Sequence, residues 1–314
     1  MRAQSINDMI LDFLSIDKTF LDSAKEVHDL KTFFEAVWKT PGDPDKPLRI
    51  LRNGSGGKVV AKFALTSQRR YKAMKDEWHN LQQCQGLHVI EYLWGGMYDG
   101  HIMIVMEYTE PFLAFSTVRD LCAASDLDFR NAIFKILFTI TLLQQKFPGF
   151  RHNDLKADNV LVTMGPARSY AFTANGLRRT FFTPAGIDVK IIDFELATSI
   201  DALSSTTVSE GSLSMRTDFG ISDKLCDVYD IHLLAYDCLR TVTPTVQAFQ
   251  KFVYAFIPST FFDPVNLTGQ FRLRFEDQDK LQGILGPNIL TKMMCHPYFF
   301  HLRGDKDATT EIEI

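Results

Sequence analysis

The feature that most constrains this chain is a polar stretch, Arg151–Val162 (RHNDLKADNVLV), which leads into three apolar residues. It places Asp154, Lys156 and Asn159 at offsets of two and five. This spacing is typical of a loop that catalyses phosphoryl transfer. In such a loop the Asp accepts the proton of an attacking hydroxyl, the Lys neutralises the moving phosphoryl group and the Asn holds a metal ion. A polar turn capped by Asp and Asn is the alternative for so short a motif.

Length, charge and cysteine content limit the classes of protein to which the chain can belong. The 314 residues are enough for two lobes, each with its own core. The 34 basic and 38 acidic residues give a net charge of −4, so we expect neither a nucleic-acid partner nor an anionic membrane surface. The most apolar helical stretch, residues 131–147, is too short and too polar to cross a bilayer. Five scattered cysteines without C-x-x-C spacing indicate reduced thiols and an intracellular protein.

The first part of the chain predicts a helical extension and then strands. Residues 5–28 place apolar side chains on one helical face, and residues 33–38 form an aromatic and β-branched run. Short strands are expected at 48–51 and 58–65. The glycine cluster between them lacks the phosphate-loop pattern and precedes a strand, so it indicates a tight turn.

Lys62 lies inside the second of these strands and therefore needs an anionic partner if its stem is buried. A helix is predicted over residues 69–85, with Glu77 on it. A strand Lys paired with a helix Glu is an arrangement that grips nucleotide phosphates. A solvated surface pair is the weaker alternative.

Two antiparallel strands, Val89–Trp94 and His101–Tyr108, are predicted next, joined through Gly95-Gly96 and Asp99-Gly100. The second is uniformly apolar over residues 102–106 and is expected at the centre of the sheet. Composition shifts after it, which indicates a boundary between lobes. Helices are then predicted over residues 116–124 and 127–146.

After the polar loop, an apolar strand over residues 188–192 delivers Asp193 and Phe194, which suits a rigidly held metal ligand or a strand-ending Asp cap. Residues 164–187 form an insert with two expected hairpin arms, at 170–172 and 180–182. A helix is predicted over residues 225–240, with Asp227 near its start, and the acidic tail after Gly304 is expected to be disordered.

Taken in order, these motifs resemble the signature of eukaryotic-type protein kinases. The residues that carry the resemblance are Val59-Val-Ala-Lys62, Glu77, Met106–Tyr108, His152–Asn159, Asp193-Phe-Glu195 and Asp227. The resemblance implies an α+β bilobal fold, with a small antiparallel β-rich lobe over residues 29–109 and a larger helical lobe over 110–303. The helical extension (1–28) precedes these lobes and the acidic tail (304–314) follows them, and ATP is expected between the lobes.

The resemblance also assigns roles residue by residue. Lys62 would contact the α- and β-phosphates and pair with Glu77. Asp154 would be the catalytic base, Lys156 the phosphate contact, and Asn159 and Asp193 the Mg²⁺ ligands. Asp227 would hydrogen-bond the backbone of the catalytic loop. The adenine and phosphate-loop contacts would be Val37, Val60, Met106 as gatekeeper, Glu107, Thr109 and Leu161.

Several positions depart from the family pattern. The glycine-rich loop is best matched by residues 30–37, which contain no glycine, Asn153 replaces the Arg of H-R-D, and Glu195 replaces the glycine of D-F-G. These changes leave a pseudokinase scaffold as one alternative. A small-alcohol phosphotransferase of the choline-kinase and aminoglycoside type is the other, because its motifs are similar.

Two features favour a protein substrate. Lys156 follows Asp154 by two residues, which points to Ser/Thr acceptors, and 34 residues separate Asp193 from Asp227, which leaves room for a peptide-binding segment. Compact, glycine-poor variants of this kind resemble kinases of large DNA viruses, so a virus-encoded enzyme acting in the cytoplasm or nucleus of a host cell is an expectation. The sequence gives no indication of the oligomeric state.

Overall fold

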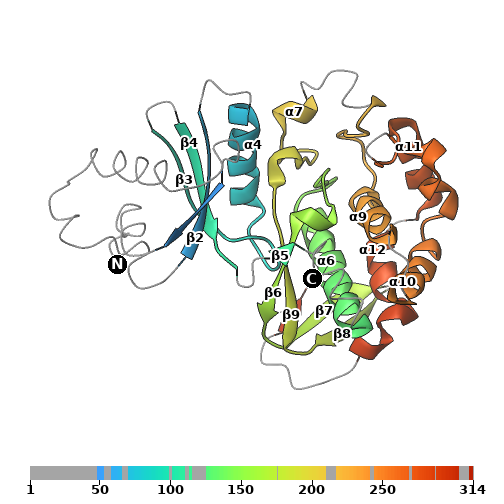
Figure 1. Cartoon of the computed structure of the whole chain (residues 1–314). Coiled ribbons are helices and arrows are strands. Elements are labelled where there is room, and N and C mark those ends of the chain that lie inside the picture. The colour runs from blue at the N-terminus through green and yellow to red at the C-terminus, as the bar shows by residue number, and fades with distance from the viewer. Residues whose placement is uncertain are drawn as a thin grey trace. The chain divides into compact units, whose positions relative to one another are not determined.

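The computed structural model describes residues 48–52, 58–65, 70–98, 101–109, 113–114, 125–174, 176–209, 217–240, 244–268, 271–286, 288–303 and 311–313 (Figure 1). The predicted helical extension, the run at 33–38 with Val37, the glycine cluster and the helix at 116–124 lie outside these residues. The chain divides into two compact units. The first runs through Gln85 and also includes Ile90–Tyr108, and the second contains Gly86–Val89 and everything from Thr109 onwards.

The first unit is an antiparallel sheet with one helix. Its strands are β1 (Leu48–Arg52), β2 (Lys58–Leu65), β3 (Tyr92–Tyr98) and β4 (His101–Glu107), in the order β1-β2-β4-β3. Helix α4 (Arg70–Gln83) packs against β2, β3 and β4. Residues 102–106 of β4 are at most 7% exposed, so the apolar run lies at the centre of the sheet as predicted.

The expected boundaries of β3 were wrong. The strand begins at Tyr92 and continues through Gly95-Gly96, where a turn was predicted. A Cβ atom at Gly95 would overlap the indole of Trp78 on α4, so glycine at this position lets the helix lie close to the strand. Val89, predicted as the start of this strand, instead forms a parallel bridge with Ile191 in the second unit.

The second unit is built around helix α6 (Asp126–Lys146), whose side chains are buried on most sides. Ser125 caps its first turn by accepting a hydrogen bond from the Asp128 backbone. A small antiparallel sheet has the order β5-β6-β9, from β5 (Leu113–Ala114), β6 (Val160–Gly165) and β9 (Gly186–Ile191). Val160 is paired with Ile191, so the end of the polar loop lies beside the end of the strand that delivers Asp193.

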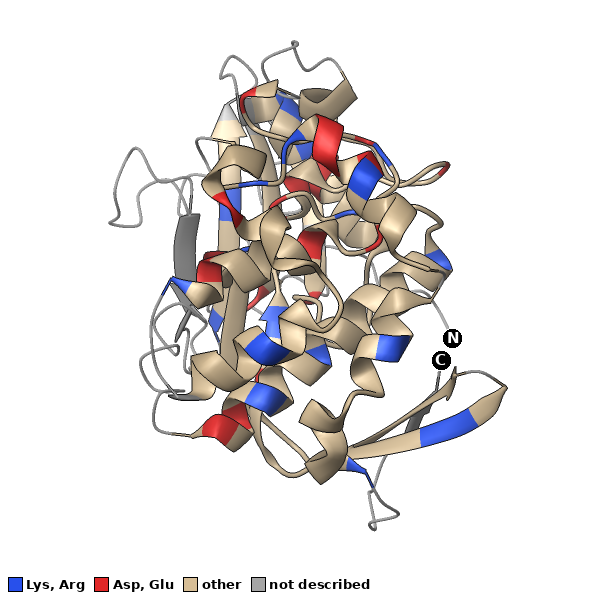
Figure 2. Ribbon diagram, turned by 90° about the vertical axis from the view of Figure 1, so that its right-hand side faces the viewer, with Lys and Arg blue, Asp and Glu red and all other residues tan. Residues whose placement is uncertain are grey.

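The insert forms the predicted hairpin, from β7 (Arg168–Ala174) and β8 (Leu177–Thr183). Figure 2 shows basic residues along one arm of it. The expectation of a disordered tail was wrong for its last part, because β10 (Glu311–Glu313) pairs in parallel with β7. The backbone edge of β7 supplies the hydrogen bonds that order this segment. The tail has no apolar pattern from which the strand could have been predicted.

A buried charge cluster fixes the hairpin to the rest of the unit. Asp188 Oδ1 lies 2.8 Å from His88 Nδ1 and 3.2 Å from Lys135 Nζ, and its Oδ2 lies 3.1 Å from Arg168. Burial alone would raise the pKa of Asp188, but the His88 hydrogen bond and the charges of Lys135 and Arg168 outweigh it and hold the pKa below its usual range. The insert is therefore an integral part of the second unit.

The remaining elements are helical. They are the helices α7 (Thr206–Ser209), α9 (Tyr229–Leu239), α10 (Pro244–Tyr254), α11 (Phe275–Ile284) and α12 (Ile289–Met294), with 3₁₀ turns η1 (Ala157–Asn159), η2 (Phe194–Leu196), η3 (Ser259–Phe262), η4 (Pro264–Asn266) and η5 (Pro297–Leu302). The helix predicted from residue 225 begins only at Tyr229. A small antiparallel β-rich unit and a larger, mainly helical unit confirm the predicted α+β class.

Within the part of the chain that the structure describes, no helix combines the length and the apolar character needed to span a membrane.

One buried histidine of α9 makes stability depend on pH. His232 is fully buried, its Nε2 lies 2.9 Å from the carbonyl oxygen of Phe261, and burial lowers its pKa to about 4. The unfolded side chain titrates near 6.5, so below that pH the unfolded chain binds the additional proton and stability falls as pH decreases.

We expect this group to remove roughly 3 kcal/mol of unfolding free energy between pH 7 and pH 4. His232→Gln retains a donor for the Phe261 carbonyl but does not titrate, so its urea-unfolding free energy should vary less with pH over the same range. Equal pH slopes in the two proteins would contradict this assignment.

Candidate active site

An ion pair in the first unit joins the strand lysine to the helix glutamate. Lys62 Nζ on β2 lies 2.6 Å from Glu77 Oε2 on α4, and the Glu77 side chain is only 2% exposed. A glutamate so deeply buried requires a cationic partner. The pair is therefore not the solvated surface pair that the sequence left open, and it holds the lysine in one position.

Two of the expected adenine contacts lie on neighbouring strands of the same unit. Val60 on β2 and Met106 on β4 are registered partners and are 3% and 7% exposed. Glu107 ends β4, where its backbone N–H donates to the Glu91 carbonyl at 2.9 Å. In the second unit Thr109 is buried, and Leu161 is buried on β6.

The polar loop, residues 151–159, brings three predicted side chains together in the second unit. Asp154 Oδ2 accepts hydrogen bonds from Lys156 Nζ at 3.0 Å and from Asn159 Nδ2 at 2.9 Å. Asp154 Oδ1 accepts a hydrogen bond from Arg272, a residue that sequence reasoning did not select. The carboxylate is therefore held from both of its oxygens.

Asn159 and Asp193 are connected through the backbone. Asn159 Nδ2 also donates to the Asp154 carbonyl at 2.9 Å, which leaves its amide oxygen as the atom suited to a cation. The Ile192 N–H donates to the Asn159 carbonyl at 3.0 Å, so the residue before Asp193 is joined to the loop. An amide oxygen and a carboxylate are hard donors of the kind that Mg²⁺ prefers.

The backbone conformation of Asp193 explains why a glutamate can occupy position 195, where the family pattern has a glycine. The left-handed backbone conformation falls on Asp193, at φ 68°, whereas Glu195 lies in the regular turn η2. Asp adopts this region more readily than most side chains. Position 195 therefore does not require glycine in this chain.

Helix α9 holds the 151–159 loop through a buried carboxylate. Asp230 Oδ2 accepts the His152 N–H at 2.7 Å and Oδ1 accepts the Asn153 N–H at 2.9 Å. Further along the helix, Asp237 accepts the Ala157 N–H at 3.0 Å. Burial raises the pKa of Asp230, against the opposing effect of these backbone hydrogen bonds and of nearby His152 and Arg151.

The prediction that Asp227 performs this role was wrong. Asp227 precedes the helix, and it pairs through its backbone N–H and its side chain with Gln282 of α11. The error follows from the helix start, which lies at Tyr229 and not at residue 225. A usable signal was present, because Leu233 and Leu234 follow Asp230 by three and four positions, on the same helical face, and are buried.

The comparisons with known proteins identify the family. The sequence model of the protein kinase domain matches residues 48–235, more than half of the chain. The chain belongs to the protein kinase family.

Two proteins of Acanthamoeba polyphaga mimivirus are similar to this kinase. One, named provisionally as serine/threonine-protein kinase R400, is 30% identical over 186 residues, which are 54% of this chain and 39% of the relative. The other, named in the same way as R301, is 33% identical over 87 residues, or 26% of this chain and 21% of the relative. The chain thus spans well under half the length of these two relatives.

In this kinase Asn153, the residue before Asp154, has a structural role. Asn153 is fully buried at φ 65°, and its Nδ2 donates to the Leu196 carbonyl at 2.9 Å and to Thr198 Oγ1 at 3.1 Å. It therefore ties the 151–159 loop to the segment that follows Asp193. A side chain in this position is not accessible to a phosphate on that segment.

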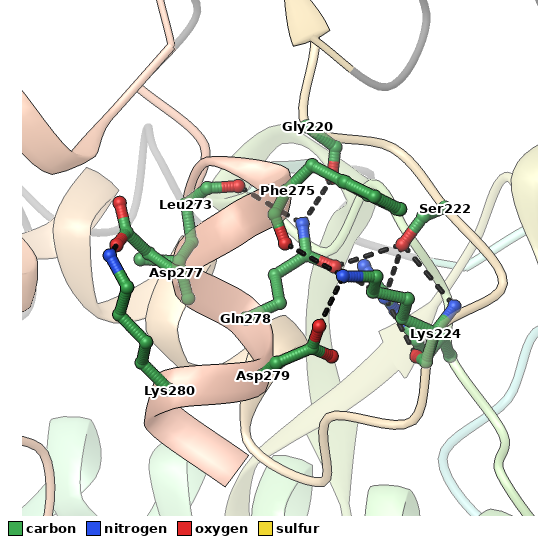
Figure 3. Close-up of polar contacts among 10 residues, drawn as sticks. Gly220, Ser222, Lys224, Leu273, Phe275, Asp277, Gln278, Asp279 and Lys280 are labelled. Carbon is green, nitrogen blue, oxygen red and sulfur yellow. Dashed lines mark hydrogen bonds and ion pairs between the residues drawn. The ribbon is translucent and has the colours of Figure 1, made fainter. Parts of the chain in front are cut away.

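Arg151 is also buried, and its contacts lie at the end of the same segment. One of its guanidinium nitrogens donates to Ser222 Oγ, the Lys224 carbonyl and Gln278 Oε1 at 2.8–2.9 Å. Figure 3 shows how Gln278 and Asp279 of α11 hold residues 220–224. The segment is therefore anchored by neutral and charged side chains of the kinase itself.

These contacts predict an enzyme that does not depend on phosphorylation of its own 199–214 segment. Phosphate orders such segments by pairing with an accessible arginine cluster, and positions 151 and 153 provide none. Protein stripped by phosphatase should keep most of its initial rate of phosphoryl transfer. A fall of tenfold or more that is recovered on rephosphorylation would show that another basic group orders the segment.

Proposed function

We propose that this kinase transfers the γ-phosphoryl group of ATP to Ser/Thr hydroxyls of protein substrates, with Mg²⁺ as cofactor. The observation that carries the proposal is the Asp154 carboxylate, held by Lys156 and Asn159 within one loop. In the reaction the acceptor oxygen bonds to the γ-phosphorus as the bond to the β-phosphate oxygen breaks. The hydroxyl proton passes to Asp154, and ADP leaves.

The other residues bind and orient the nucleotide. Lys62, held by Glu77, carries charge for the α- and β-phosphates, and Lys156 carries charge for the transferred group. Asn159 and Asp193 would hold Mg²⁺, which neutralises phosphate charge when it is bound. Val60, Met106 and Leu161, which are buried apolar side chains, would contact the adenine ring, and the backbone of Glu107 and Thr109 would bind its polar groups.

A protein acceptor is supported by two observations. The mimivirus relatives carry the name of serine/threonine-protein kinases. Residues 220–224 are fixed to α11 by Gln278 and Lys224, which provides a rigid end to the segment against which a peptide would lie. A small-alcohol enzyme needs an enclosed acidic pocket in place of such a segment.

We infer an intracellular setting, in which a virus-encoded kinase acts in its host. The cysteines that the structure describes, Cys84, Cys226, Cys238 and Cys295, are free thiols, as expected in a reducing compartment. The origin of both relatives in a giant virus supports the second part of the inference.

A labelling experiment tests this function. With γ-labelled ATP and Mg²⁺, wild type should label a mixed protein substrate on Ser/Thr but not choline, ethanolamine or aminoglycosides. Asp154→Ala removes the proton acceptor and should lower the rate by about 10²–10³-fold. Asp158→Ala, in the same loop but at an exposed position, is the matched control and should stay close to wild type.

Each other outcome has a defined meaning. Label on the small alcohols alone would contradict the protein-kinase function. Full activity of Asp154→Ala would contradict the assigned base. A wild-type protein that neither binds nor turns over ATP would show that the chain is a pseudokinase.

A further inference from the structure

A second cation, outside the 151–159 loop, contacts the proposed catalytic base. Arg272 donates a hydrogen bond to Asp154 Oδ1 from 118 residues further along the chain. The two side chains are only 8% and 10% exposed. The family motifs that predicted Lys156 and Asn159 contain no counterpart of this arginine, so it is a feature of this chain's own structure.

A strained turn delivers the arginine. The Thr268 N–H donates to the Arg272 carbonyl at 2.7 Å, and the Phe271 N–H donates to the Thr268 carbonyl at 2.9 Å. Phe271 has φ 61°, a conformation that is costly for a bulky side chain. Its ring stacks on Tyr236 of α9 at a centroid distance of 5.2 Å. Strain of this kind persists where surrounding contacts impose it, and it is common at functional sites.

The same helix therefore fixes both partners. Asp230 and Asp237 of α9 hold the backbone of the 151–159 loop, and Tyr236 of α9 holds the turn that carries Arg272. Contacts with one helix therefore position both Asp154 and Arg272.

The two oxygens of the Asp154 carboxylate differ in how many hydrogen bonds they can still accept. An ionised carboxylate has about four acceptor positions, two on each oxygen. Lys156 and Asn159 occupy the two positions of Asp154 Oδ2, and Arg272 occupies one position of Oδ1. An acceptor hydroxyl can therefore donate its proton only to Oδ1, the oxygen that Arg272 holds in place.

We propose that Arg272 is a positioning residue for phosphoryl transfer, which fixes Asp154 so that Oδ1 faces the acceptor hydroxyl. This inference rests on the proposed function. Because Arg272 acts on the base and not on the nucleotide, its loss should lower kcat and leave the affinity for ATP unchanged. A misplacement of about 1 Å at a reacting group typically costs on the order of 10²-fold in rate.

The test compares two neighbouring arginines. Arg272→Ala should lower kcat about 10- to 100-fold, with KM for ATP and the ATP dissociation constant within about twofold of wild type. Arg274→Ala is the matched control. The Arg274 side chain donates to the Leu267 carbonyl at 3.0 Å and so supports the same turn, but among the described residues it forms no hydrogen bond or ion pair with Asp154. Its kcat should stay within about threefold of wild type.

Two further measurements separate positioning from folding. Guanidinium ion at millimolar concentration should restore part of the rate of Arg272→Ala, whereas urea at the same concentration should not. If the alanine variant does not fold, Arg272→Lys, which keeps the charge at shorter reach, should show an intermediate kcat and an unchanged KM for ATP.

The inference is overturned if Arg272→Ala, or Arg272→Lys in its place, keeps the wild-type kcat. A raised kcat also overturns it, because Arg272 would then be an inhibitory contact. An equal loss in Arg274→Ala, or a folded Arg272→Ala that guanidinium does not rescue, would assign the residue to the turn alone. These results differ from failure of the proposed function, in which wild type itself transfers no phosphate.

Discussion

The Asp230 carboxylate is the contact on which the rest of the site depends. It is buried in α9 and accepts the backbone N–H groups of His152 and Asn153, which immediately precede Asp154. A buried carboxylate that lost these donors would be left without compensation, and the two N–H groups would be unsatisfied as well. The free-energy cost of leaving these buried groups unpaired therefore keeps the loop bound to the helix. The positions of Lys156 and Asn159 follow from that of Asp154.

Much of this arrangement was predictable from local pattern. The apolar run around Lys62 predicted β2, and the residues around Glu77 predicted α4, so a pairing of the two side chains was one of two alternatives; the structure shows that the pair forms and that its glutamate is buried. The spacing of Asp154, Lys156 and Asn159 predicted a loop in which these side chains meet, and in the structure Lys156 and Asn159 both donate to the Asp154 carboxylate. Turn residues in the insert likewise predicted the β7–β8 hairpin.

What could not be predicted depends on contacts between distant segments. Arg272 lies in a polar turn without any motif, and only the folded chain brings it to Asp154. The pairing of β10 with β7 depends on a free strand edge, which has no signature in the tail. Gly95 was interpreted as a turn residue because the sequence does not show that Trp78 packs against it. The role of Asp230 was assigned to Asp227 because the helix begins at Tyr229, four residues later than predicted, so that Asp227 precedes the helix and Asp230 faces the loop.

The departures from the family pattern have local physical reasons. Asn153 adopts a left-handed conformation that Asn tolerates, and its amide donates hydrogen bonds that link the loop to Leu196 and Thr198. In the family pattern this position holds an arginine that binds a phosphate. Glu195 is accommodated because the positive φ falls on Asp193. The substituted residues thus stabilise the local structure, and the charged groups proposed for phosphoryl transfer are present.

The most direct test of this account compares Asp230→Asn with Asp227→Asn. Asparagine at position 230 keeps one acceptor but places an N–H₂ group against a backbone donor. Phosphoryl transfer should then fall by about 10²-fold, and hydrogen exchange in peptides covering residues 151–159 should become faster. Asp227→Asn should leave both close to wild type. Equal losses in the two variants, or a loss at Asp227 alone, would contradict the claim that α9 positions the site through Asp230.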